Sequence, residues 1–267
     1  MDLEVRKAMQ FPRNTFVMLG LPMCFVAVVW GQSSPPSRLD MRSVLRTMQA
    51  PGAGQQGTDE FVITGSPYSC EVTTEITRTA TDGTNFHRQP GVVREYRDSY
   101  GRTRTESSGP AGDSGQAQTL IFIRDPVGQV LYVLDSQRLT AVSRRLQTPG
   151  AKSAQELYQT NLTAPPRSPY VTRQPLGPQT MEGVYVEGFR FVTTFPAGIF
   201  GNDRAFVVTE ERWVAPDMAL RIFIKRSDPR FGQTLIRRTN ISRVEPDPAL
   251  FQVPANYTVV GVPAAPR

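Results

Sequence analysis

One stretch of the chain, from Thr119 to Val142, constrains the fold more than any other. It reads TLIFIRDPVGQVLYVLDSQRLTAV and holds two runs of β-forming residues, Leu120–Ile123 and Val130–Leu134, on either side of the tetrapeptide Asp125-Pro126-Val127-Gly128. Asp, Pro and Gly at the first, second and fourth positions favour a type I turn, because Pro presets φ and the Asp side chain bonds the backbone. Both runs are apolar on nearly consecutive residues, which is typical of strands buried on both faces. The stretch therefore predicts a tight meander at the centre of a β-sheet.

The same signals continue along the chain from Asp59. Segments rich in Thr, Val and Ile alternate with short turns that contain Gly, Pro or Asp. We expect turns at Asp82-Gly83, Ser99–Gly101, Glu182-Gly183, Ala215–Asp217 and Asp228–Gly232. These turns separate roughly ten strands, joined mostly in sequence, and such a meander must curl into a barrel or pack as a sandwich to protect its edges.

Two short helices are expected outside the strands. The apolar residues of Arg38–Met48 are spaced as on one helical face and stop at Ala50-Pro51-Gly52, which predicts a leading amphipathic helix. Later, Thr148–Gln174 interrupts the strands, and Ala154, Leu157 and Tyr158 indicate a short helix within it. Long connections of this kind serve as lids or binding loops, or are disordered.

The N-terminus has the three parts of a secretory signal peptide: a basic start, an apolar run, and small residues before a cut after Gly31. The alternative is an uncleaved anchor in the inner membrane, because the apolar run is close to the ~17-residue lower limit for a spanning helix. Either reading predicts an exported chain, periplasmic or extracellular. Loss of this segment lowers the net charge from +6 to +5. We divide the chain into residues 1–31 (signal or anchor), 32–58 (helix and flexible linker), 59–260 (a single β domain) and 261–267 (tail).

The chain is poor in the residue types that carry chemistry. His87 is its one histidine, and only Cys70 remains after signal cleavage, which excludes an intrachain disulfide and argues against a typical zinc site. The protease-like tetrapeptide Gly112-Asp113-Ser114-Gly115 lacks a base in a catalytic context. We therefore predict no catalytic residue, no metal and no cofactor. The expected export and the absence of a basic-aromatic reader motif also argue against nucleic acid as a partner.

Acidic residues alternate with arginines in several strands. Glu95, Glu106, Glu210 and Glu211 all follow this pattern, which predicts cross-strand ion pairs on a solvated sheet face rather than acid/base pairs. The charges between residues 92 and 106 mark that hairpin as exposed on at least one face.

The aromatic residues allow two interpretations. They are ordinary core, or the sheet curls around an apolar cavity and some of them line it. Phe189, Phe191 and Phe195 share one parity, so they point to the same side of an unbroken strand. The residues that we expect to contact a ligand, if there is a cavity, are Phe122, Tyr132, Leu157, Tyr158, Phe191, Phe195, Trp213 and Phe223.

Several motifs together resemble a family of exported bacterial proteins of unknown function, over roughly Phe61 to Tyr257. They are Tyr96-Arg97-Asp98-Ser99-x-Gly101-Arg102-Thr103-Arg104-x-Glu106, Asp125-Pro126, Tyr132-Val133-Leu134-Asp135, Glu182-Gly183-Val184 and Asp247-Pro248-x-Leu250-Phe251-x-Val253-Pro254-x-x-Tyr257. The layout is also distantly similar to the outer-membrane lipoprotein carrier (LolA-like) and sigma-regulator (RseB-like) half-barrel fold. The chain departs from the family in its 148–174 insert and its Gly-rich 51–58 linker.

This resemblance implies a mainly-β fold: a curved antiparallel meander that forms an incomplete barrel, with a leading amphipathic helix and one short helix in a long loop. It supplies no catalytic residue. Three functions follow as hypotheses. The first is a non-enzymatic extracytoplasmic protein that binds a lipid, an acyl chain or a lipoprotein segment. The second is an envelope sensor or scaffold that binds a protein partner through the Arg/Glu hairpin at residues 92–106. The third is a carbohydrate-active hydrolase, which would need two unpaired acids across a cleft.

Overall fold

The computed structural model describes residues 62–80, 82–88, 91–111, 117–146, 150–162 and 168–261. The expected signal segment, the leading helix and the Gly-rich linker lie outside these residues. Within the part of the chain that is described, no helix is long and apolar enough to cross a membrane.

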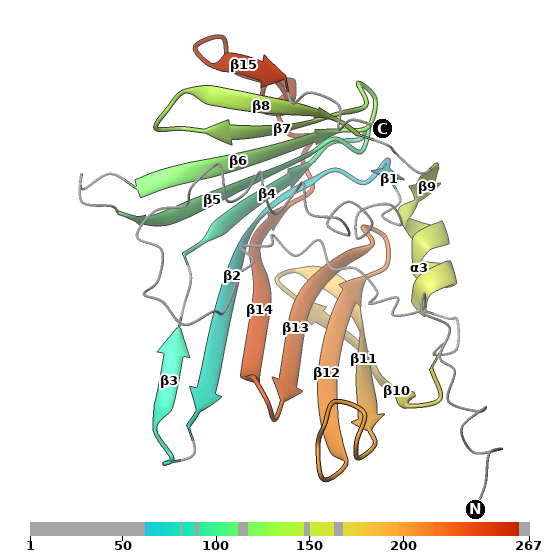
Figure 1. Ribbon diagram of the computed structural model, residues 1–267. Coiled ribbons are helices and arrows are strands. Elements are labelled where there is room, and N and C mark those ends of the chain that lie inside the picture. Colours follow the sequence, from blue (N-terminus) through green and yellow to red (C-terminus); the bar gives the residue numbers. More distant parts are fainter. Residues whose placement is uncertain are drawn as a thin grey trace, which may run out of the picture.

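A single sheet of 13 strands makes up most of the molecule (Figure 1). One half consists, in spatial order, of β10 (Val171–Met181), β11 (Val184–Phe195), β12 (Phe206–Ala215), β13 (Leu220–Asp228) and β14 (Gly232–Ser242). The other half consists of β4 (Val93–Arg97), β5 (Thr103–Ala111), β6 (Ala117–Asp125), β7 (Val130–Asp135), β8 (Thr140–Arg145) and β15 (Thr258–Gly261). The strand β2 (Tyr68–Thr79) joins the two halves.

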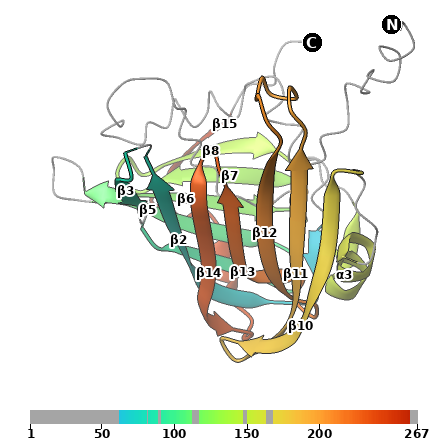
Figure 2. The same cartoon turned by 90° about the horizontal axis from the view of Figure 1, so that it is seen from below.

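The sheet divides along β2. On one side β2 pairs with β14 over almost its whole length. On the other side its first residues, Tyr68–Val72, pair with β4, while Ile76–Thr79 pair with the short strand β3 (Asn85–Arg88). Figure 2 shows the result: strands β4–β8 run across the direction of β12–β14. The expected mainly-β fold with an open, curved antiparallel sheet is confirmed, and the sheet does not close into a barrel.

Two strand pairs depart from the expected antiparallel meander, because they are parallel. The strand β15 pairs with β8 at the end of the sheet, and β1 (Val62–Thr64) pairs with β9 (Ala151–Ser153) in a separate two-stranded ribbon. The count of roughly ten strands was too low, since 15 strands are described. Short strands of three or four residues are too brief for a sequence period to reveal.

The central meander is confirmed as β6, β7 and β8. The Asp125 carboxylate accepts hydrogen bonds from the backbone N–H groups of Val127 and Gly128, at 2.9 Å each, as the turn chemistry predicts. Ile123 and Leu134 are fully buried in these strands. Together with Ile121 and Ala141 they form a core cluster that is covered by Phe251 of the 3-10 helix η1 (Pro248–Phe251).

A second core cluster lies where β2 begins. It contains Tyr68, Cys70 and Val72 of β2 with buried residues of β11, β13 and the β12–β13 turn. The expected short helix is confirmed as α3 (Ala154–Leu162), which buries Ala154 and Leu157. The 148–174 region is more regular than expected, because it also contains β9 and the start of β10.

Candidate ligand-binding face

The register of the strands separates the β10–β14 half of the sheet into two faces of different chemistry. One row crosses six strands through Ile76, Thr234, Arg226, Glu210, Phe191 and Arg173. The adjacent row on the same face contains Thr74, Ile236, Ile224, Arg212, Phe189 and Pro175. We call the face that carries these two rows the inner face. Along β2 it also carries the core residues Tyr68, Cys70 and Val72, whereas in β11 the core residues Val184 and Val186 have the opposite parity to Phe189 and Phe191.

The opposite face carries a polar row, as an alternating strand pattern predicts for a sheet with a solvated side. Its row between those two contains Glu75, Leu235, Lys225, Glu211, Arg190 and Gln174. Arg190 and Glu211 are register partners and form an ion pair at 2.7 Å. The prediction of cross-strand ion pairs on a solvated face is confirmed for this pair.

Guanidinium groups lie over aromatic rings along the inner face. The Arg212 guanidinium is 4.5 Å from the centre of the Phe191 ring, and Arg173 is 5.6 Å from that of Phe189. Phe189 and Phe191 are only partly buried, so this surface is apolar and reachable. The shared parity expected for the phenylalanines of β11 is confirmed by their register partners.

The stacking continues to the end of the strands. Phe195 and Phe206 are register partners with ring centres 4.9 Å apart. The Arg230 guanidinium lies 4.7 Å from the centre of the Phe206 ring and 5.6 Å from that of Phe195. The partly buried aromatic surface therefore extends from the middle of the inner face to its edge.

A chain of alternating charges accompanies these rings. The Glu210 carboxylate accepts a hydrogen bond from the Arg212 guanidinium and lies 3.4 Å from that of Arg226. The Asp228 carboxylate lies 3.5 Å from the Arg226 guanidinium and 2.8 Å from that of Arg230. Burial would raise the pKa of Asp228, but hydrogen bonds from Arg230 and the charges of Arg230 and Arg226 hold this pKa below its ordinary value. Three guanidiniums face two carboxylates, so the chain has one positive charge in excess and favours an anionic group.

An open pocket of about 360 Å³ lies at the end of this chain. The β11–β12 loop, from Phe200 to Phe206, forms one wall, and Pro229 and Arg230 of the β13–β14 turn form the other. It joins the edge of the inner face to the outside of the molecule.

The charges of the hairpin at residues 92–106 have a different role from the one expected. Glu95, Arg97 and Arg104 are buried, so the expectation of an exposed charged hairpin is wrong for these three. Arg238 of β14 donates two hydrogen bonds to the Glu95 carboxylate, at 3.0 and 3.2 Å. Arg97 donates to the backbone oxygens of Ser66 and Met218, and Arg104 to that of Leu250. These arginines tie distant segments together and are not available to a partner.

The buried Glu95 and its surroundings also shift the pKa values of two neighbouring groups, the Cys70 thiol and the Tyr68 hydroxyl. Burial, assisted by the negative charge of Glu95, raises the pKa of the Cys70 thiol to about 12. The same two causes raise the pKa of the Tyr68 hydroxyl. Both groups therefore remain neutral at physiological pH, and Cys70 is an unreactive core residue.

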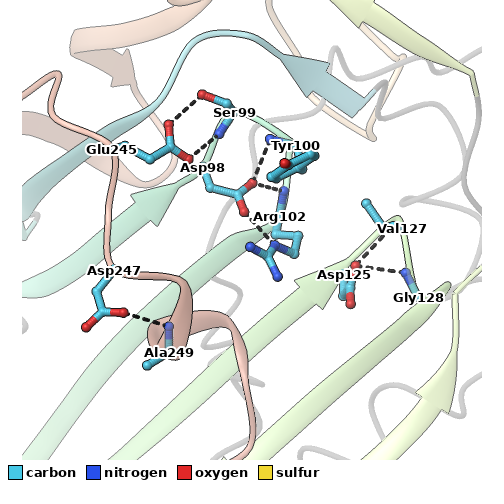
Figure 3. A network of polar contacts seen from close by, with 10 residues as sticks. All are labelled: Asp98, Ser99, Tyr100, Arg102, Asp125, Val127, Gly128, Glu245, Asp247 and Ala249. Carbon is cyan, nitrogen blue, oxygen red and sulfur yellow. Dashed lines mark hydrogen bonds and ion pairs between the residues drawn. The ribbon is translucent and has the colours of Figure 1, made fainter.

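The motif residues that carry the family resemblance are turn formers (Figure 3). Asp98 accepts hydrogen bonds from the backbone N–H groups of Tyr100 and Arg102, and Asp247 accepts one from that of Ala249. Glu245 accepts hydrogen bonds from the backbone and hydroxyl of Ser99, which fixes the β4–β5 turn against the segment before η1. These contacts give Asp98, Ser99 and Asp247 of the motifs a structural role in turns.

The residues expected to line a cavity lie in three places. The register puts Phe122, Phe191 and Phe195 on the same face of the sheet, with Phe122 in the other half. Tyr132 faces the opposite side and packs against the cluster around Phe251. Leu157 is buried in α3.

Of the remaining three expected residues, Tyr158 contacts the end of the inner face, because its partner Glu187 has the same parity in β11 as Phe189 and Phe191, whereas Trp213 and Phe223 lie on the opposite face. Tyr158 of α3 donates its hydroxyl hydrogen bond to Glu187 of β11. Trp213 and Phe223 are register partners on the face opposite Phe191, and the Trp213 ring covers Gly188 so closely that a Cβ there would be 2.5 Å from it. Trp213 and Phe223 therefore point away from a ligand that is bound beside Phe191.

Sequence reasoning missed the arginines of the inner face. Arg173, Arg212 and Arg230 were not among the expected ligand-binding residues, although each lies within 6 Å of a phenylalanine ring. The available signal was the period of two that places Phe189 and Phe191 on one side of β11 and Glu210 and Arg212 on one side of β12, but it gives no register between the strands.

Comparison with known proteins identifies similar structures only. No family model matches the chain, and no curated protein matches it. An uncharacterized conserved protein from Thermus thermophilus is 11% identical, with a TM-score of 0.40, 74% of this chain covered and 91% of that chain. MucB in the Pseudomonas aeruginosa MucA/MucB complex is 12% identical, with a TM-score of 0.39, and 74% of this chain matches 59% of that chain.

A third similar structure, from Vibrio parahaemolyticus, is described as an outer membrane lipoprotein-sorting protein domain. It is 8% identical, with a TM-score of 0.29, and the match covers 71% of this chain and 91% of that one. No residue of the inner face is carried over from these proteins.

Proposed function

We propose that this protein is a non-enzymatic extracytoplasmic binding protein that holds an amphipathic, anionic ligand, such as an acyl chain with an acidic head group, on its inner face. The observation that carries the proposal is the row of partly buried phenylalanines with guanidiniums lying on their rings. Phe189 and Phe191 lie under Arg173 and Arg212, and Phe195 and Phe206 lie under Arg230.

Both parts of such a ligand find a matching surface. An acyl chain gains about 0.8 kcal/mol for each methylene that it buries, and the exposed ring surfaces follow one line along β11 and β12. The excess positive charge of the Arg212–Glu210–Arg226–Asp228–Arg230 chain supports an acidic head group at the same face. Arg226 and Arg230 retain about a third of their side-chain surface, so their guanidiniums can reach a ligand.

The state of the carboxylates supports binding rather than hydrolysis. A hydrolase of the glycosidase type needs two acids free to exchange protons. Among the described residues, every buried carboxylate is held by an arginine: Glu95 by Arg238, Asp98 by Arg102, Asp135 by Arg138, Glu210 by Arg212 and Asp228 by Arg230. Within the same ranges no group of three metal-ligating side chains occurs.

The proposal is tested by displacement of a fluorescent fatty acid from delipidated protein. We expect Phe191→Ser to weaken binding by about tenfold or more, because it removes a ring from the middle of the apolar row. Phe223→Ser is the matched control: Phe223 is also partly buried and also lies under an arginine, Arg237 at 5.8 Å, but on the opposite face.

Two results would contradict the proposal. One is a delipidated protein that takes up no fatty acid and no phospholipid. The other is an equal loss of affinity in Phe191→Ser and Phe223→Ser. Such a result would show that a general disturbance of the fold, and not the loss of a ring from the inner face, weakens binding.

A further inference from the structure

Three connections between strands lie at the same end of the sheet. The register shows this directly, because one row crosses His87, Thr77, Gln233, Ser227, Thr209 and Val192 in neighbouring strands. The β2–β3 hairpin, the β13–β14 turn and the β11–β12 loop all lie beyond that row. Figure 1 shows the three connections pointing the same way, at its lower edge, and Figure 2 agrees.

Each of the three carries a large apolar side chain that is exposed to solvent. Phe86 in β3 is 58% exposed, Phe200 in the β11–β12 loop 56%, and Phe231 in the β13–β14 turn 65%. Ile199, next to Phe200, is also exposed. We call these four residues the hairpin-end patch. Single exposed apolar residues are ordinary, but four on adjacent connections at one end of a sheet mark an interaction surface.

Arginines accompany the apolar residues at each connection. Arg88 follows Phe86 by two residues, Arg230 precedes Phe231, and Arg204 lies in the same loop as Phe200. The Arg230 guanidinium lies 4.9 Å from the centre of the Phe231 ring and 5.3 Å from that of Phe200. The described charges at this end, Arg78, Arg88, Arg204 and Arg230 against Asp82, Asp203 and Asp228, leave one positive charge in excess.

From this arrangement we propose that the hairpin-end patch docks the protein on the surface of an anionic phospholipid bilayer. Aromatic side chains favour the interfacial zone of a bilayer, and guanidiniums beside them lie at the level of the lipid phosphates. Three connections that carry these residues at one end can enter the interface together while the strands stay outside. The open pocket between Phe200 and Arg230 then faces the head groups.

This inference is independent of the ligand on the inner face, since it concerns the end of the sheet. The two surfaces meet at Arg230, which stacks on Phe206 of the inner face and on Phe231 of the patch. The patch and the inner face are therefore adjacent at Arg230.

The test is flotation of the exported protein with vesicles of phosphatidylglycerol and phosphatidylcholine, compared with vesicles of phosphatidylcholine alone. We expect binding to the anionic vesicles, and a reduction of about tenfold or more in the double variant Phe200→Ser/Phe231→Ser. Tyr100→Ser is the control, because Tyr100 is 66% exposed in the β4–β5 turn, near the start of β2 and about 30 Å from the patch along that strand. This control should bind as the unchanged protein does.

A second measurement gives the orientation, even if the N-terminal segment contributes to membrane binding. Tryptophan introduced as Phe200→Trp should be quenched by brominated lipids in the vesicles, whereas Tyr100→Trp should not. Absence of binding to anionic vesicles overturns the proposal. So does equal binding to both kinds of vesicle, unchanged binding of the double variant, or equal quenching at positions 100 and 200. Unchanged fatty-acid displacement in the double variant would separate this surface from the inner-face site.

Discussion

Replacing Arg238 by methionine should destabilise the fold by about 3–5 kcal/mol, because it leaves the Glu95 carboxylate buried without its partner. Both side chains are almost completely buried. The pair spans β2: Arg238 is the register partner of Val72 on one side, and Glu95 that of Cys70 on the other. Arg238 also donates a hydrogen bond of 2.7 Å to the backbone oxygen of Arg221, and the substitution removes this bond too.

The measurement is urea denaturation of the single variants and of Glu95→Gln/Arg238→Met. Removing both partners should be less harmful than the sum of the two single losses, with a coupling of about 1–3 kcal/mol. Since a loss of 1 kcal/mol lowers the Tm of a chain of this size by about 2–4 °C, Arg238→Met should lower it by roughly 6–20 °C. Arg94→Met is the control, because Arg94 is exposed and its contact with Glu71 is 3.6 Å; it should change stability by less than about 1 kcal/mol.

A loss below about 1 kcal/mol in Arg238→Met, together with additive single variants, would refute this reasoning. It would mean that the Glu95–Arg238 pair is in contact with water. Because the register places Arg238 on the same face as Ile236 and Thr234, that result would also undermine the inner face as the buried side of the sheet.

Two further predictions concern stability. The pKa of Cys70 is raised from 9.0 to about 12. The stability that the neutral thiol contributes is therefore fully present below about pH 9 and falls by about 1.4 kcal/mol per pH unit as the pH rises toward 12. The urea midpoint of Cys70→Ala should decline less steeply between pH 9 and 10.5 than that of the unchanged protein, and parallel curves would contradict this. Gly232→Ala should lower the free energy of unfolding by more than about 2 kcal/mol, because Gly232 has a φ of +86° and a Cβ would lie 2.2 Å from the backbone oxygen of Thr77; thermal unfolding checks this, and a Tm within 2 °C of the unchanged protein's would exclude it.

The parts of the fold that local chemistry determines could be predicted from the sequence. The turn at Asp125 follows from the preferences of three residue types, and the common side of Phe189 and Phe191 follows from the period of two. The pairing of β2 with β14 could not be predicted, because their partners are separated by more than 150 residues and nothing in either strand encodes the register. For the same reason Glu95 was expected on a solvated face: it alternates with arginines in its own strand, and only the pairing across β2 shows that Glu95 and its partner Arg238 are buried.

The sequence predicted that aromatic residues would form the candidate site, but not which aromatic residues would do so. Two of its aromatic residues, Phe191 and Phe195, were among those expected to contact a ligand. Trp213 was expected there as well, and lies on the other face because it is an odd number of positions from Glu210 in β12. The hairpin-end patch had a signal that went unused: Phe200 and Phe231 each stand directly before a glycine, in segments whose other residues are typical of turns.

The two ends of the sheet differ in how their large side chains are buried. At the end where β2 begins, Arg97 and Tyr68 are buried, and throughout the described residues no buried side-chain nitrogen or oxygen lacks a hydrogen-bond partner. At the other end, Phe200 and Phe231 remain mostly in water and contribute little to folding, since apolar groups stabilise a fold only when they are buried. The described part of the chain pairs its buried polar groups and yet leaves phenylalanines exposed at three neighbouring connections. Folding does not require these exposed rings, and such positions are where a function is expected. A bilayer surface is a partner that would bury those rings without unfolding any strand.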